Sequence, residues 1–132
     1  MRAWIVSLLA ANSLAAGACP GDADLRARDL LGTWRAQFAG TGPSADLVLQ
    51  ANPDWPDSLA GRIRRDGREA RLAGDLESGT FTLEESADGV RIDAVWVGQP
   101  VPGTCGREIR GVWREGGQEQ GRDFVLRRVI GW

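Results

Sequence analysis

The sequence predicts an all-β protein, a single-domain antiparallel up-and-down β-barrel of eight strands. Three observations predict this fold class. Apolar and polar residues alternate through most of the chain, as they do in strands with one buried face. Turn-forming pairs such as Asp66-Gly67 interrupt the alternation and leave short connections, which make neighbouring strands antiparallel. A pattern of glycine between two apolar residues also recurs along the chain, as described next.

The repeated pattern places an apolar residue two positions before and two positions after a glycine. Its four copies are centred on Gly32, Gly61, Gly74 and Gly111. In a strand this spacing puts all three residues on one face. The glycine then leaves room for a neighbouring side chain or lets the strand coil sharply. Eight such strands close well into a barrel filled by its own side chains or by one small ligand.

Residues 1–18 predict an export signal. A short basic start is followed by a mostly apolar stretch, and small residues (Ala16-Gly17-Ala18) precede the expected cleavage site. The apolar stretch is too short to span a bilayer convincingly. We therefore expect a periplasmic or secreted protein. Residues 19–30 should form a polar entry segment with one short, solvated helical turn, and residues 31–132 the barrel domain.

Cys19 and Cys105 are the two cysteines of the chain. In an oxidising compartment we expect them to form a disulfide. Closing so long a loop would stabilise the fold by roughly 4 kcal/mol in the chain-entropy model. Alternatively, Cys19 directly follows small residues and resembles a bacterial lipoprotein cleavage site. The protein would then be a membrane-anchored lipoprotein with a lipid on Cys19, although that motif usually has Leu where this chain has Ala16.

The first four strands are expected over residues 32–39, 45–51, 59–65 and 68–76. Between the second and third, the prolines in 52–57 cannot join a ladder. Asp66-Gly67 then gives the strongest hairpin signal of the chain, because both central turn residues need a positive φ. Ser78-Gly79 forms the turn between the fourth and fifth strands. The remaining strands are expected over residues 80–85, 90–97, 107–115 and 122–129.

Alternation within these strands predicts which residues fill the barrel. The outward residues are mostly charged or polar, and arginines among them should form cross-strand ion pairs. The inward set consists of Trp34, Phe38, Leu47, Leu49, Ile63, Leu72, Leu76, Phe81, Leu83, Ile92, Trp96, Trp113, Phe124 and Leu126.

Gly32-x-Trp34 at the start of the first strand and Arg127-Arg128 at the end of the last resemble the calycin superfamily of lipocalins, fatty-acid-binding proteins and avidins. In lipocalins the indole of this motif packs under an arginine of the last strand. The resemblance implies structural roles for Gly32 and for Arg128, which shares parity with Phe124 and Leu126. It also implies a barrel that binds a small ligand. The chain is similar, too, to small periplasmic inhibitors of bacterial metalloproteases, which are eight-stranded and disulfide-bonded.

The composition disfavours several classes of function. The chain has no histidine, which removes the commonest general base and every histidine-based triad or zinc site. Glu84 and Glu85 should point to opposite faces of a strand, which is poor geometry for paired acid–base chemistry. The formal net charge is −2 with interspersed signs, so nothing indicates nucleic-acid binding. We expect no enzyme, no catalytic residue, no cofactor and no metal.

Tryptophans are the candidate ligand-binding residues. Trp34, Trp96 and Trp113 face inward, where an indole can stack on a flat ligand or simply fill the barrel. Trp55 lies in a loop, where it can cap a ligand, anchor a partner or fold over the open end. The preferred function is an exported, non-enzymatic barrel that binds a small apolar or amphipathic ligand. The alternative is a cell-envelope interaction module or protease inhibitor that binds an envelope protein through its loops.

Overall fold

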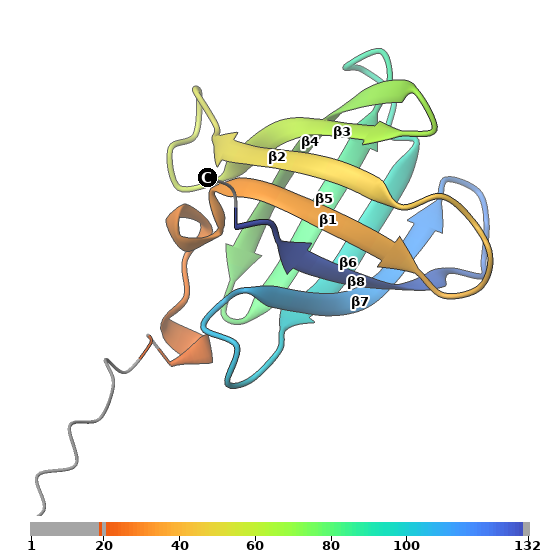
Figure 1. Ribbon diagram of the computed structural model, residues 1–132. Coiled ribbons are helices and arrows are strands. Elements are labelled where there is room, and N and C mark those ends of the chain that lie inside the picture. Colours follow the sequence, from red (N-terminus) through yellow and green to blue (C-terminus); the bar gives the residue numbers. More distant parts are fainter. Residues whose placement is uncertain (1–18, 20, 131–132) are drawn as a thin grey trace, which may run out of the picture.

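The computed structural model describes Cys19 and residues 21–130 as an all-β protein (Figure 1). Its eight strands form a closed antiparallel barrel in sequence order, with β1 hydrogen-bonded to β8. This confirms the predicted fold class. The strands are β1 (Gly32–Phe38), β2 (Ala45–Ala51), β3 (Leu59–Arg65), β4 (Arg68–Glu77), β5 (Thr80–Ser86), β6 (Ala94–Pro100), β7 (Glu108–Glu115) and β8 (Arg122–Arg128).

The remaining elements precede the barrel. Two 3-10 helices, η1 (Asp22–Asp24) and η2 (Ala27–Leu30), lie in the entry segment. At three and four residues, these described helices fall far short of a membrane span. The export signal predicted for residues 1–18 lies outside the described residues.

The sixth strand differs from its prediction. It begins at Ala94 rather than at residue 90, so Val90 is 89% exposed and Ile92 49% exposed. The reason is a side chain, since the Asp88 carboxylate accepts hydrogen bonds from the backbone N–H groups of Val90 and Arg91, both at 2.8 Å. These local bonds compete with the strand ladder and widen the turn into a loop. The prediction that Ile92 belongs to the core was therefore wrong.

The middle of the barrel is filled by side chains. Trp96 lies fully buried with its ring 4.8 Å from that of Phe124 and 5.4 Å from that of Phe38. The strands also approach one another closely, because a Cβ atom at Gly61 would lie 2.0 Å from the backbone oxygen of Val48. A Cβ atom at Gly111 would meet the backbone oxygen of Val97 at the same distance. At Gly74 a Cβ atom would lie 1.9 Å from the backbone oxygen of Thr82. Three glycines of the repeated pattern are thus required by tight packing of strand on strand.

The entry segment closes one end of the barrel. Its residues Leu25, Ala27 and Leu30 are at most 5% exposed and belong to the core. The segment was expected to be solvated. Arg26, Arg28 and Asp29 are exposed, but the apolar residues extend the core past the ends of the strands. The predicted disulfide between Cys19 and Cys105 is present and ties the segment to the β6–β7 loop.

Arg128 on β8 and Trp34 on β1 join the entry segment to the last and first strands. The Trp34 indole N–H donates to the backbone oxygen of Leu30 at 2.8 Å, and the guanidinium of Arg128 lies 4.9 Å above the indole ring. Arg128 also donates to the backbone oxygens of Leu31, at 2.8 Å, and of Asp29. Gly32 has a φ of +132°, which an L side chain rarely adopts.

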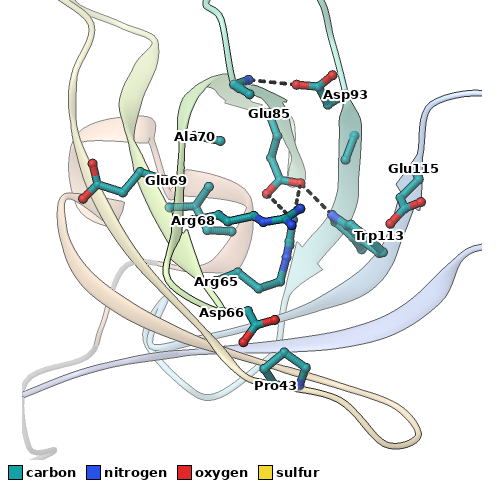
Figure 2. A pocket seen from close by; sticks show the side chains of 13 residues that line it. Pro43, Arg65, Asp66, Arg68, Glu69, Ala70, Glu85, Asp93, Trp113 and Glu115 are labelled. Atoms are coloured by element: carbon teal, nitrogen blue, oxygen red, sulfur yellow. Dashed lines mark hydrogen bonds and ion pairs between the residues drawn. The ribbon is translucent and has the colours of Figure 1, made fainter.

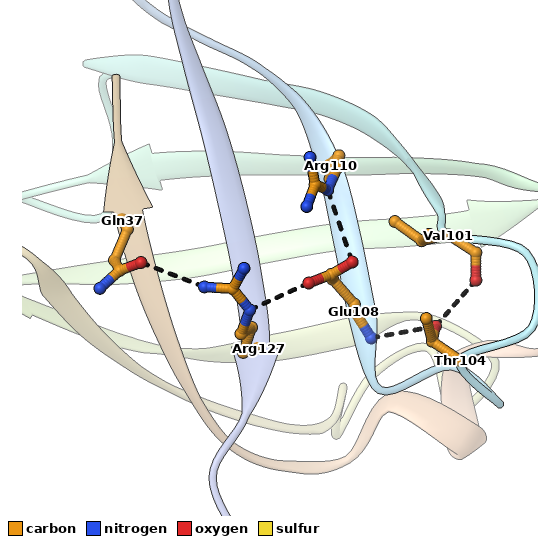
Figure 3. Close-up of polar contacts among 6 residues, drawn as sticks. All are labelled: Gln37, Val101, Thr104, Glu108, Arg110 and Arg127. Carbon is orange, nitrogen blue, oxygen red and sulfur yellow. Dashed lines mark hydrogen bonds and ion pairs between the residues drawn. The ribbon is translucent and has the colours of Figure 1, made fainter. Parts of the chain in front are cut away.

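On the outer surface, polar side chains cross the seam where the barrel closes (Figure 3). Arg127 on β8 donates to Glu108 on β7 at 2.9 Å and to Gln37 on β1 at 3.1 Å. Arg110 donates to the other oxygen of Glu108 at 3.4 Å. Exposed pairs of this kind contribute little to stability, so closure depends mainly on the backbone ladder and the core.

Arg128→Met is expected to destabilise the fold by about 2–3 kcal/mol, because it removes two hydrogen bonds from a cation and its stacking on Trp34. The neighbouring Arg127→Met removes only exposed contacts and should cost less than about 1 kcal/mol. Urea unfolding of the two variants beside the wild type measures both values. Equal losses in the two variants would show that the Arg128 contact has no special role.

Candidate functional site

The two ends of the barrel differ in construction (Figure 1). Because neighbouring strands are antiparallel, the β2–β3, β4–β5 and β6–β7 connections share the end closed by η2. The β1–β2, β3–β4, β5–β6 and β7–β8 connections lie at the opposite end. There the barrel opens onto a hollow of about 550 Å³, which we call the mouth.

The floor of the mouth carries a buried carboxylate. Glu85, only 2% exposed, faces inward with the same parity as Phe81 and Leu83. One of its oxygens accepts the Trp113 indole N–H at 2.8 Å, and Arg65 donates to both oxygens at 3.2 and 3.5 Å (Figure 2). We call Arg65, Glu85 and Trp113 the floor cluster. Its hydrogen bonds give a buried anion the partners that it needs.

Arg65 reaches across the lumen to complete this cluster. It lies on β3, four strands from the β7 strand of Trp113 in either direction around the closed barrel, so the two residues face each other. The guanidinium carbon of Arg65 lies 4.9 Å from the centre of the Trp113 ring and 5.9 Å from that of Phe38. Its Nη1 atom is buried without a hydrogen-bond partner among the described residues. A carboxylate on one side and aromatic faces on the other thus hold the cation.

The β5–β6 loop forms part of the rim of the mouth. The pKa of Asp88 is lowered from 3.8 to about 2, chiefly by the backbone N–H of Arg91, then by that of Val90 and by the Ser86 hydroxyl. A lowered pKa in the folded state means that the carboxylate supports the loop at pH above about 4 and loses this effect as the pH falls through about 2. Asp93 adds a hydrogen bond from the backbone N–H of Ala87 at 2.8 Å. The rim loop is therefore held in place at neutral pH.

The structure separates the four tryptophans predicted to bind a ligand. Trp113 lines the mouth. Trp34 is buried at the closed end, and Trp96 is buried in the middle of the core. Trp55 lies on the β2–β3 loop at the closed end, 71% exposed and folded over neither opening. One of the four predicted residues therefore belongs to the mouth.

Two residues of the floor cluster were missing from the sequence-based prediction. Arg65 has the same strand parity as Leu59 and Ile63, and Glu85 that of Phe81 and Leu83. Parity alone thus assigns both charged side chains to the inside of the barrel. Two opposite charges at inward positions indicate an ion pair inside the barrel. The prediction missed this pair because it assigned only apolar residues to the interior.

Trp55 is displayed by an ordered loop. The side-chain oxygen of Asn52 accepts the backbone N–H groups of Asp54 at 3.0 Å and Trp55 at 3.3 Å. The backbone N–H of Ser58 donates to the carbonyl of Trp55 at 2.8 Å, and the Ser58 hydroxyl donates to Asp75. These bonds fix the backbone on both sides of an exposed indole.

Comparison of the sequence with protein families and with curated proteins finds no match. The described residues contain no group of three or more His, Cys, Asp or Glu side chains placed to hold a metal ion. The candidate site is therefore defined by its own geometry, an open mouth above the floor cluster.

Glu85→Gln is expected to destabilise the fold by about 2 kcal/mol, since it leaves the Arg65 guanidinium without its anion inside the barrel. The adjacent Glu84→Gln removes the same charge on the exposed face of β5 and should change stability by less than about 0.5 kcal/mol. Urea unfolding followed by tryptophan fluorescence compares the two. A loss no greater for Glu85→Gln than for Glu84→Gln would contradict the assigned role of the floor cluster.

Proposed function

We propose that this protein is an exported, non-enzymatic, calycin-like barrel that binds a small amphipathic molecule in its mouth. The observation that carries the proposal is the hollow of about 550 Å³ above the floor cluster. This size falls within the ordinary range of small-molecule sites. The closed end, the disulfide and the filled core give the hollow a stable wall and floor.

The lining of the mouth supports an amphipathic ligand. Ile63, Ala70 and Ala94 offer apolar surface, and Trp113 offers an aromatic ring. Charged groups stand beside them, among them Arg68 and Glu115. Because the middle of the barrel is filled, the ligand lies at the mouth rather than deep in the lumen.

Two further features support the calycin-like and exported parts of the proposal. Arg128 packs over Trp34, and a Cβ atom at Gly32 would lie 3.3 Å from the Nη1 atom of Arg128. This is the contact implied by the resemblance to lipocalins. The disulfide of Cys19 with Cys105 is of the kind that persists in oxidising compartments outside the cytosol. The sequence contains no histidine, which supports binding rather than acid–base catalysis.

Filling the mouth tests this function. Nile red, a neutral apolar dye whose emission rises when it leaves water, serves as the probe. Ala70→Trp places an indole in the mouth and should weaken dye binding at least about tenfold, because the ligand and the new side chain compete for one space. Ala73→Trp, on the exposed face of the same strand, is the matched control and should bind the dye as the wild type does.

Urea unfolding confirms that both variants fold before their dye affinities are compared. Nile red binding that is undetectable in the wild type, or equally strong in both variants, would overturn a binding site in the mouth.

A second candidate function is favoured by Trp55. We propose as the alternative that the protein is a cell-envelope interaction module or protease inhibitor that binds its partner through the β2–β3 loop. Native mass spectrometry of the protein taken from its own envelope distinguishes the two functions. A bound small molecule supports the ligand-binding barrel, whereas a bound protein lost on Trp55→Ala, with Nile red binding unchanged, supports the interaction module.

A further inference from the structure

The mouth carries its arginines and its glutamates on different strands, and this arrangement suggests what kind of ligand fits it. The strand register sets the order of the inward residues at this level of the barrel. Arg65 on β3 is paired with Arg68 on β4. Glu85 on β5 is paired with Ala94 on β6, and Ala94 with Glu115 on β7. Two arginines therefore stand side by side, and two glutamates follow them around the ring.

Not all of these charges are available to a ligand. Arg65 and Glu85 neutralise each other in the floor cluster. Glu69, which also lines the mouth, is paired on the outer surface with Arg62 and Arg64. The mouth's other charged residues, Arg68, Asp66, Asp93 and Glu115, form no ion pair with any residue that the structure describes.

The unpaired charges are separated in space. Arg68 belongs to β4 and Glu115 to β7, three strands apart in a closed ring of eight, so they lie on different sides of the lumen. Asp93 immediately precedes β6 and so lies on the Glu115 side, whereas Asp66 occupies the β3–β4 turn near Arg68. Carboxylates outnumber guanidinium groups, so the mouth attracts a cation more strongly than an anion.

We infer that the ligand is a small zwitterion on an apolar frame, with its cationic group toward Glu115 and Asp93 and its anionic group toward Arg68. Its apolar part then lies against Trp113, Ala70 and Ala94, between the two charged sides. A free amino acid with an apolar side chain is the simplest molecule of this class. This inference rests on the proposed function, because it names the ligand class of the same mouth.

A matched series of four compounds tests the inference on the intact protein. Phenylalanine is the zwitterion, phenylalaninamide carries only the cation, N-acetylphenylalanine only the anion, and N-acetylphenylalaninamide neither. Calorimetric titration should rank the zwitterion first and the cation second, ahead of the anion and the neutral compound. Each lost charge contact should weaken binding by about threefold to tenfold, and added salt should reduce the differences.

Two variants assign the charged groups of the ligand to the two sides. Arg68→Gln should weaken phenylalanine binding about threefold without weakening phenylalaninamide, since the amide lacks the group that Arg68 recognises. Glu115→Gln should weaken both compounds and leave N-acetylphenylalanine no worse than before. Glu84→Gln removes a carboxylate outside the mouth and should change none of these affinities.

The outcomes are distinguishable from failure of the proposed function. Nile red binding that depends on Ala70, together with equal affinities across the series or no binding of any member, overturns the zwitterion and leaves the binding barrel standing. Tighter binding of the anion or of the neutral compound than of phenylalanine also overturns it. Loss of both Nile red and phenylalanine binding refutes the mouth as a site altogether.

Discussion

An eight-stranded barrel is narrow, so every inward side chain must fit against those that face it across the lumen. This constraint governs the rest of the structure. Trp96, Phe124 and Phe38 occupy the middle, and the glycines of the repeated pattern allow the strands to close tightly around them. These side chains fill the middle of the barrel, and the hollow of about 550 Å³ lies at the mouth.

The same constraint explains the floor cluster. An apolar core could have continued to the mouth, yet Glu85 and Arg65 stand at inward positions where the core meets water. A buried ion pair is seldom a net source of stability compared with apolar residues of equal size. Its value lies in orientation, because hydrogen bonds from two directions fix the carboxylate and hold the Trp113 ring edge-on to it. The mouth thereby gains a polar floor of defined geometry.

Much of the fold could be predicted from the sequence, because turns and parity act locally. Asp66-Gly67 determines a hairpin almost alone, and alternation then assigns the faces of β3 and β4. The start of β6 could not be predicted this way. Asp88-Gly89 has the composition of an ordinary hairpin turn, but the Asp88 side chain accepts the backbone hydrogen bonds that would otherwise extend the strand ladder. The burial of Leu25 was missed for a related reason, because a single apolar residue in a charged segment shows no strand period.

The candidate site was predictable only in part. Parity places Arg65, Glu85 and Trp113 inside the barrel, but their contact depends on closure, which brings strands far apart in the sequence to face one another. The tryptophans illustrate the limit, since residue type alone does not distinguish Trp113 at the mouth from Trp34 under Arg128.

The first and last residues that the structure describes, Cys19 and Ile130, both lie at the closed end of the barrel (Figure 1). The disulfide and the last residues of β8 are found there as well. A fusion partner, a solid support or any other tether joined through either end would therefore leave the mouth facing the surrounding solution. The four connections at the mouth are likewise remote from the disulfide and from the contact of Arg128 with Trp34. They offer positions at which a designer could graft new recognition loops without disturbing the elements that hold the barrel shut.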